Sequence, residues 1–174
     1  YLNKYGVSVG QNLLFFTNND SAYETAIDFF HKGLNVQAIV DVRNETNGHF
    51  TKIAKDLGIT ILNGYEIVNT IGRLRVQEVK LKKLHTNNID ENKSSITIKC
   101  DTICVSGGWT PTVHLFTQSK GKLKYRDSDG SFVPEEAFQK TLCLGSCNGD
   151  YDLHKILDSL PSRVNNFLNL LGNK

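Results

Sequence analysis

The chain has 174 residues, with 20 basic and 18 acidic side chains, and its formal net charge at pH 7 is +2. Because no long basic run accompanies this balance, the sequence lacks the electrostatic footprint of a nucleic-acid-binding domain. Its apolar runs are far shorter than the ~20 residues of a membrane-spanning helix, and no stretch resembles a signal peptide. We therefore expect a cytoplasmic protein whose partners are neither nucleic acid nor a membrane.

Two features predict an internal segment of a longer polypeptide. The sequence contains no methionine, and it opens on Tyr1 as though cut from a larger chain. A chain of this length buries one good core, with the edge of a second. We expect one domain with attachments.

The four cysteines form two pairs with C-x3-C spacing, Cys100 with Cys104 and Cys143 with Cys147. Both pairs fall in strand-like apolar runs, where residues i and i+4 share a face but are about 13 Å apart. This separation is too long for a disulfide and awkward for one metal ion, so we predict buried free thiols. A C-x-x-C redox pair is absent. The five histidines lack ligand spacing, and no metal site is predicted.

The first half of the chain alternates strands and helices. The first helix follows the first strand at once and starts with a capping box, in which the Ser21 hydroxyl accepts from the Glu24 amide and the Glu24 carboxylate reaches back to the Ser21 amide. Helical spacing then continues until Gly33. The predicted elements are strands over residues 12–16, 36–40 and 59–62 and helices over residues 21–32 and 49–57.

From residue 65 the hydrophobic period changes from helical to alternating. The alternation, a polar loop over residues 85–95 and a strand over 96–98 predict an antiparallel meander. A buried run at residues 103–105 then rejoins the parallel sheet. This order predicts a Rossmann-like α/β fold, with helices on one face of a twisted parallel sheet and the meander on the other.

The character of the sequence changes again after Pro111. Thr110 and Pro111 suit the N-cap and first position of a helix over residues 112–119. Further on we predict a strand over 122–125, a buried strand over 141–144 and a helical region from Asp150, and these strands lack obvious partners. The predicted domains are a linker over residues 1–10, a dinucleotide-binding-type domain over 11–111 and a partial second lobe over 112–174.

Three blocks of sequence carry a family resemblance. They are Phe16-Thr17-Asn18-Asn19-Asp20-Ser21-Ala22-Tyr23, Val105-Ser106-Gly107-Gly108-Trp109-Thr110-Pro111-Thr112-Val113-His114-Leu115-Phe116 and Gln118-Ser119-Lys120-Gly121-Lys122-Leu123. In this order they resemble the alpha subunits of the heterotetrameric sarcosine oxidase family. The architecture also resembles the NAD domain of the pyridine nucleotide-disulphide oxidoreductases.

The resemblance implies a place in a four-subunit enzyme that oxidatively demethylates sarcosine to glycine. In that family the demethylation takes place at a flavin held by the beta subunit. The alpha subunit carries NAD, shares an FMN site and bears a folate-binding domain, so FAD, FMN and folate are expected only in the complete complex. The partners implied are the other domains and subunits of this oxidase, and the segment alone is expected to be inactive.

The loop after the first strand departs from the dinucleotide fingerprint. The three glycine positions of Gly-x-Gly-x-x-Gly fall on Thr17, Asn19 and Ala22. A carboxylate at Asp20 also stands where a pyrophosphate would lie. Since Asp20 and its neighbours Ser21 and Glu24 can occupy the positive end of the helix, we predict a self-capped helix without a dinucleotide there.

Asp41 and Arg43 form a secondary candidate pair. Asp41 lies a little over twenty residues after the loop, where the ribose-binding acid of the fingerprint belongs, and Arg43 would suit a 2′-phosphate. The alternative is that they are an ordinary acid and base of a strand-to-helix loop.

Two further loops are the main candidates for cofactor contact. The glycines after the strand over 103–105 allow a ligand close to the backbone, or else form a tight crossover packed by Trp109. The turn from Gly145 to Asp150 has Ser146 where superfamily reductases have an aspartate that holds the flavin ribityl chain, which fits NAD in place of flavin; the alternative is a helix-capping turn made by Asn148 or Asp150. The predicted cofactor-binding residues are Ser106, Gly107, Gly108, Trp109, Gly145, Asn148 and Gly149.

Three functions remain open. The leading hypothesis is a non-catalytic scaffold that supplies part of an NAD site in an oxidoreductase subunit. The second is a self-sufficient NAD(P)-dependent flavin reductase, against which the missing glycines and the missing C-x-x-C pair count. The third is a subunit-interaction module without nucleotide, which docks through the meander and the apolar residues of the last helix.

Overall fold

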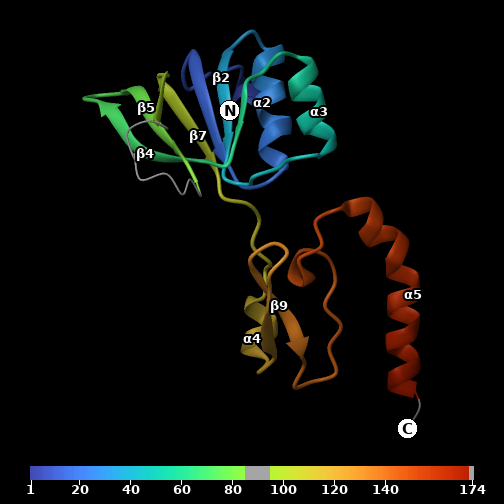
Figure 1. The fold of residues 1–174 in the computed structure, drawn as a ribbon. Helices are drawn as coiled ribbons and strands as arrows, with labels where there is room; N and C mark the ends of the chain where they lie inside the picture. The colour runs from blue at the N-terminus through green and yellow to red at the C-terminus, as the bar shows by residue number, and fades with distance from the viewer. Residues whose placement is uncertain (85–94, 173–174) are drawn as a thin grey trace. The chain divides into compact units, whose positions relative to one another are not determined.

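The computed structural model describes residues 1–84 and 95–172, so the predicted loop over 85–95 lies almost wholly outside the described residues. The chain divides into two compact units, Tyr1–Gly108 and Trp109–Lys174. We describe each unit by itself (Figure 1).

The first unit is built on a four-stranded parallel sheet with the strand order β3-β2-β1-β7. Its strands are β1 (Asn12–Thr17), β2 (Asn35–Asp41), β3 (Ile61–Asn63) and β7 (Thr102–Ser106). Helices α2 (Ser21–His31) and α3 (His49–Asp56) connect the first three strands, and a short helix α1 (Leu2–Tyr5) precedes them within the region expected as a linker. Gly33 and Gly58, at φ of 78° and 76°, end the two longer helices as the sequence predicts.

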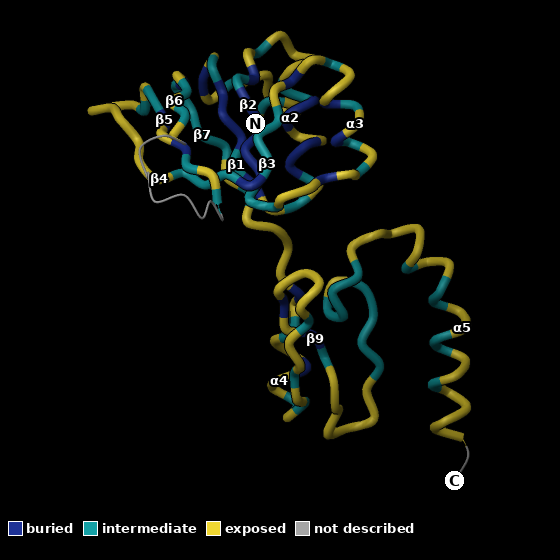
Figure 2. The backbone as a smooth tube through the Cα atoms, in the orientation of Figure 1, coloured by how far each residue is buried: buried dark blue, intermediate teal, exposed yellow. Residues whose placement is uncertain are grey.

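Alternate residues of β1 supply two cores, one on each face of the sheet. Leu13 and Phe15 pack with the helices α2 and α3. Leu14 packs with Val79 and Leu81 of the meander. This arrangement follows from the period of two along a strand, and it confirms helices on one face and the meander on the other (Figures 1 and 2).

The meander is a separate three-stranded antiparallel sheet with the order β4-β5-β6. Its strands are β4 (Tyr65–Gly72), β5 (Val76–Lys83) and β6 (Ser95–Lys99). Strand β5 alternates between buried residues that face the parallel sheet and half-buried or exposed charged residues on the other side. One face is therefore wet, as the alternating sequence predicts.

The second unit contains α4 (His114–Gln118), β8 (Lys122–Arg126), β9 (Ser131–Glu136), the 3-10 helix η1 (Gly145–Asn148) and α5 (Leu153–Gly172). Strands β8 and β9 form an antiparallel hairpin, so the expectation that β8 lacks a partner is wrong. The N-cap of α4 is Val113, which corrects the prediction of Thr110 as N-cap and Pro111 as first helical residue. No residue of α5 is fully buried (Figure 2).

The buried strand predicted over residues 141–144 is absent. This segment has no regular structure, although Leu144 keeps an extended backbone with φ of −137° and ψ of 153°. A strand needs a hydrogen-bonded neighbour, and the described strands of this unit are occupied by pairing with each other in the β8–β9 hairpin. The apolar sequence favours an extended backbone here, but the ladder that would make it a strand is missing.

The cysteines are all free thiols, as predicted, but only Cys100 is buried. Cys100 packs in the core beneath the meander, whereas Cys104 packs against the core beneath the helices. The expectation that this pair shares a face is therefore wrong. Among the described residues no helix is long and apolar enough to cross a membrane.

The substitution Leu13→Ala should lower the free energy of unfolding by about 2–5 kcal/mol, because Leu13 is 0% exposed and its removal leaves a cavity between sheet and helices. Leu74→Ala is the matched control, since Leu74 is 100% exposed. The control should change stability by less than about 0.5 kcal/mol. Urea denaturation followed by circular dichroism compares the two, and equal losses would contradict the core assigned here.

Candidate functional site

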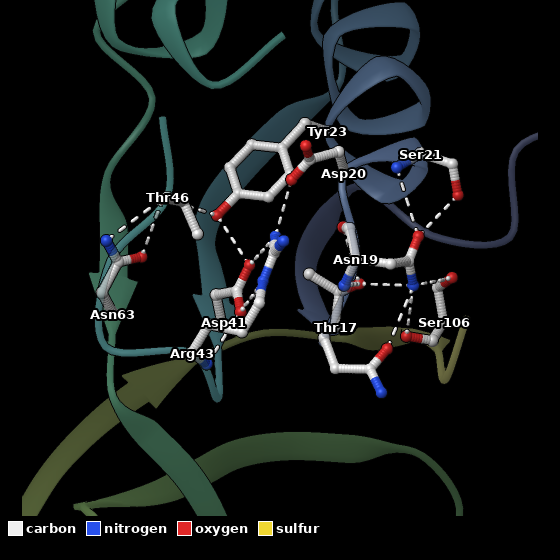
Figure 3. Close-up of polar contacts among 11 residues, drawn as sticks. Thr17, Asn19, Asp20, Ser21, Tyr23, Asp41, Arg43, Thr46, Asn63 and Ser106 are labelled. Carbon is white, nitrogen blue, oxygen red and sulfur yellow. Dashed lines mark hydrogen bonds and ion pairs between the residues drawn. The ribbon is translucent and has the colours of Figure 1, made fainter. Parts of the chain in front are cut away.

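The turn after β1, where a dinucleotide fold holds a pyrophosphate, is filled by the side chain of Asn19 (Figure 3). Asn19 Nδ2 lies 3.1 Å from both Thr17 Oγ1 and Ser106 Oγ, and 3.2 Å from the carbonyl oxygen of Ser106. Asn19 Oδ1 accepts from the Ser21 amide at 3.2 Å and from the Ser21 hydroxyl at 2.6 Å. One amide group therefore joins the end of β1, the end of β7 and the start of α2.

The start of α2 differs in detail from the predicted capping box. Ser21 is the first helical residue and Asp20 is the N-cap, so the prediction of Ser21 as N-cap is wrong by one position. The Asp20 side chain makes no cap hydrogen bond, and its carboxylate instead pairs with Arg43 at 2.8 Å. The prediction that the chain occupies this helix end from within nevertheless agrees with the hydrogen bonds of Ser21 to Asn19.

The glycine pair after β7 lies against the same turn. Gly108 has φ of 93°, and a Cβ there would stand 3.3 Å from Asn18 Oδ1. Gly107 has an ordinary backbone conformation and open space where its Cβ would be. Only Gly108 therefore needs to be glycine for the fold.

Asp41 is held in a dense polar cluster at the end of β2. Its side chain is 0% exposed. Oδ1 accepts from the backbone amide and Nε of Arg43 at 2.9 and 3.1 Å, and Oδ2 accepts from Arg43 Nη2 at 2.8 Å and from the Tyr23 hydroxyl at 2.9 Å. The carboxylate thus receives a full set of donors from the chain itself.

Arg43 bridges this buried carboxylate to the turn after β1. The same Nη2 atom that binds Asp41 also lies 2.8 Å from Asp20 Oδ1. Hydrogen bonding to Asp41 raises the pKa of Arg43 above its usual value. Arg43 is therefore committed to two carboxylates of its own chain (Figure 3).

Tyr23 closes the cluster from the helix side. Burial, together with the charge of Asp41, raises the pKa of the Tyr23 phenol to about 12. Its hydroxyl also lies 3.4 Å from Thr46 Oγ1, which receives a hydrogen bond from Asn63 Nδ2 at 3.1 Å. The cluster links α2, β2, β3 and the loop before α3 (Figure 3).

In the second unit, η1 is framed by two left-handed glycines, Gly145 at φ of 64° and Gly149 at φ of 71°. The carbonyl of Gly149 accepts from Arg126 Nη2 at 3.2 Å, and Asn148 Nδ2 donates to Asp150 at 2.9 Å. The first amides of α5 are bound by the carboxylate of Asp152, which corrects the alternative of a cap made by Asn148 or Asp150.

The predicted residue Trp109 lies near the turn around η1. Its ring lies 6.0 Å from that of Tyr151, and the neighbouring Thr112 amide donates to the Ser146 carbonyl at 3.1 Å. A cavity of about 390 Å³ opens beside Gly149 and Tyr151, with Lys155 and Arg163 on its wall. The structure thus brings Trp109, Gly145, Asn148 and Gly149 together within the second unit.

The remaining predicted site residues lie in the first unit, at the carboxyl edge of the parallel sheet. Ser106 ends β7 beside Asn19, and Asp41 ends β2. No group of acidic, histidine and cysteine side chains suited to a metal ion occurs within residues 1–84 and 95–172.

Comparison with known proteins finds one kind of similar protein. The chain is 30% identical over 162 residues to the sarcosine oxidase subunit alpha of Corynebacterium sp. strain U-96, covering 91% of this chain and 16% of that protein. It is 28% identical over 133 residues to the corresponding subunit of Rhizobium meliloti strain 1021, covering 76% of this chain and 12% of that protein. The chain is therefore similar in sequence to a segment of sarcosine oxidase alpha subunits. It spans only 12–16% of the length of these two proteins.

The fold is that of the flavoprotein disulfide reductases. A flavoprotein disulfide reductase of Escherichia coli matches with a TM-score of 0.60 at 14% identity, over 95% of this chain and 37% of its own. Thioredoxin reductase of T. acidophilum matches with a TM-score of 0.57 at 12% identity, over 92% of this chain and 53% of its own. These matches confirm the Rossmann-like fold predicted from the sequence, and no family model matches the chain.

Several residues that hold the turn after β1, the Asp41 cluster and the η1 turn were not predicted from the sequence. In the dinucleotide fingerprint Asn19 counts only as a missing glycine, although an asparagine two residues after a strand is suited to binding neighbouring backbone groups. The hydrogen bond from Tyr23 to Asp41 has no sequence signal, because an aromatic residue on the inner face of a helix is typical of a hydrophobic core. Arg126 and Arg163, which bind the carbonyls of Gly149 and Cys143, carry no local signal because their partners are distant in sequence.

Wild-type protein should lose stability relative to Tyr23→Phe as pH rises from about 10 to about 12. The folded state keeps the Tyr23 proton up to a pKa of about 12, against 10.0 when the group is unperturbed, so its contribution is complete below pH 10 and lost as pH rises through the folded value. Two pKa units correspond to about 3 kcal/mol. Urea denaturation of both proteins across this range measures the difference, and parallel pH profiles would contradict it.

Proposed function

We propose that the chain is a non-catalytic domain of a sarcosine oxidase-type alpha subunit, where it acts as a scaffold and supplies part of an NAD site. The sequence relationship to sarcosine oxidase subunit alpha supports this placement. The oxidative demethylation of sarcosine then belongs to the full complex, with its flavins and folate, and the partners of this chain are the other domains and subunits of that enzyme.

The observation that carries the proposal is the self-filled turn after β1. A dinucleotide binds such a turn because glycines let the pyrophosphate approach the backbone and the free amides of the helix. Here Asn19 takes the amide of Ser21 and both oxygens of Ser106, while Asp20 adds a negative charge. A pyrophosphate would have to displace these contacts and approach a carboxylate.

The proposal leaves Asp41 and Arg43 out of the nucleotide site. Asp41 is fully buried and already has four hydrogen-bond contacts, so no oxygen is left to bind a ribose hydroxyl. Arg43 is held between two carboxylates and lacks the freedom to take a 2′-phosphate. The same occupancy counts against a self-sufficient NAD(P)-dependent flavin reductase, which needs a working nucleotide turn.

The residues proposed for NAD contact come from the two other glycine-containing loops. They are Ser106, Gly107, Gly108 and Trp109 after β7, and Gly145, Asn148 and Gly149 around η1. Left-handed glycines at positions 108, 145 and 149 allow close approach of a ligand to the backbone.

Calorimetry of this chain with NAD+, NADH, NADP+ and NADPH should give no tight binding, because the part of the site held by this segment is incomplete. A commercial NAD-dependent dehydrogenase of known NAD affinity serves as the positive control for the titrant. Stoichiometric binding of any of these nucleotides with a Kd at or below the micromolar range would contradict the proposal and favour the flavin reductase.

In the full-length polypeptide, Gly107→Leu should weaken NAD binding at least about tenfold, which corresponds to about 1.4 kcal/mol. Gly107 has open space at its Cβ and an ordinary φ, so the fold tolerates the side chain while a ligand against the backbone does not. Gly172→Leu, at a second open glycine, is the matched control. Unchanged NAD affinity in the Gly107 variant, with normal thermal stability, would remove this loop from the site.

A second candidate function is subunit docking without nucleotide. It is favoured by α5, where Leu153, Leu157 and Leu168 are each more than half exposed along one helix. The half-buried residues of α5 include Ile156 and Val164, so the helix rests on its own unit with only part of its apolar stripe. Association with the remaining subunits when NAD is absent from both partners would favour this candidate.

A further inference from the structure

A cavity of about 500 Å³ opens at the amino end of the parallel sheet, against the meander. This volume falls within the ~300–1,000 Å³ of small-molecule sites. The turn after β1 lies at the opposite, carboxyl end of the same strands. The cavity therefore shares no residue with that turn or with the loops proposed for NAD contact.

Two backbone hydrogen bonds build the wall of the cavity from the meander to the parallel sheet. The amide of Cys100, the residue after β6, donates to the carbonyl of Gln77 in β5 at 3.1 Å. The next amide, that of Asp101, donates to the carbonyl of Asn12 in β1 at 2.9 Å. Both sheets therefore contribute hydrogen-bonded backbone to the wall.

A β-bulge in β2 brings an amide side chain to this wall. The register between β1 and β2 shifts between Leu13 and Leu14, which leaves Gln37 between two paired residues of β2. Such bulges re-aim a side chain and are rare between parallel strands. Gln37 lines the cavity, and its Nε2 donates to Asn12 Oδ1 at 3.3 Å. The bulge thus places a polar side chain, held by Asn12, in the cavity wall.

Two cationic side chains of the wall carry charge that the chain does not compensate. Arg75 and Lys99 both line the cavity, and both are exposed. Within residues 1–84 and 95–172 neither of them forms an ion pair. The side-chain amide of Gln77 is a further hydrogen-bond donor on the same wall. The cavity therefore presents donors suited to an anion.

The one acid on this wall, Asp101, is already bound by the chain. Its Oδ2 accepts from the backbone amides of Gln11 and Asn12, each at 3.0 Å, and its Oδ1 accepts from the Thr102 hydroxyl at 2.9 Å. Burial acts to raise the pKa of Asp101, but these hydrogen bonds outweigh it and lower that pKa. With two cations against this single carboxylate, the wall remains positive.

Val76 and Cys100 give the cavity an apolar part. Cys100 is 3% exposed, and both residues pack in the core beneath the meander. A buried thiol behaves as a small hydrophobic group. A carboxylate matches the planar guanidinium of Arg75 with two parallel hydrogen bonds. A ligand that suits the whole cavity therefore combines a carboxylate with an apolar body.

We propose that this cavity binds a small organic carboxylate, with its anionic group on Arg75 and Lys99 and its apolar body against Val76 and Cys100. This inference goes beyond the proposed nucleotide role and does not rest on it.

Naphthoate is the probe, because it joins one carboxylate to a rigid apolar body. Titration of the isotope-labelled whole chain, followed by two-dimensional amide NMR spectra, should give saturable shifts at Val76, Gln77, Lys99 and Cys100, with a Kd in the millimolar range or below. Naphthamide, which lacks the charge, and inorganic phosphate, which lacks the apolar body, should each bind at least about tenfold more weakly.

The variants Arg75→Gln and Lys99→Gln should each weaken naphthoate binding at least about threefold, and the double variant at least about tenfold. Arg73→Gln is the matched control, since Arg73 is exposed in the same turn as Arg75 but does not line the cavity. It should bind naphthoate like wild type. All three substitutions are at exposed positions, and thermal denaturation verifies that each variant is folded.

Four outcomes would overturn the proposal. They are the absence of saturable shifts in the wild-type chain, shifts that gather away from the cavity, binding of naphthamide or phosphate as tight as that of naphthoate, and an equal loss of affinity in Arg73→Gln and Arg75→Gln. The wild-type spectra decide the first three without any variant.

Discussion

The arrangement of the first unit depends on the pairing of one buried charge, the carboxylate of Asp41. A buried carboxylate is costly unless charge and hydrogen bonds compensate it, and here Arg43 and Tyr23 supply both. Because Tyr23 comes from α2 and Arg43 also reaches Asp20, this compensation sets the helix and the turn after β1 relative to the sheet. The polar cluster therefore positions the very loop in which a dinucleotide fold would place its ligand.

That constraint explains how a dinucleotide-type fold remains stable although the side chain of Asn19 occupies the turn after β1. In a binding domain, ligand phosphates would satisfy the amides at the start of the helix. In this chain the side chain of Asn19 binds the amide of Ser21. Asp41, the acid expected to bind a ribose, instead accepts hydrogen bonds from Arg43. The fold keeps its architecture because internal side chains replace the ligand. In the role proposed above, the first unit is then structural, and nucleotide contact is expected from loops whose backbone is still open.

The first unit was predictable because its signals are local. Leu13 and Leu14 lie next to each other on one strand and must face opposite cores, so alternation alone places helices and meander. For the turn after β1, the sequence predicts that a dinucleotide is excluded but not which contacts fill the turn. Missing glycines indicate that a ligand is excluded, but the contact between Asn19 and Ser106 joins residues 87 positions apart. Hydrogen-bond partners of that separation leave no periodic trace in a sequence.

The second unit shows why an apolar run does not by itself determine a strand. Residues 141–144 have the composition of one, and Leu144 has its backbone angles, but hydrogen-bonding partners on a neighbouring strand are lacking. The backbone angles of a residue follow from its own side chain and its immediate neighbours, whereas a strand also needs hydrogen-bond donors and acceptors on a second segment. Apolar, strand-favouring residues therefore predict an extended backbone, and the arrangement of the rest of the unit decides whether that backbone is paired.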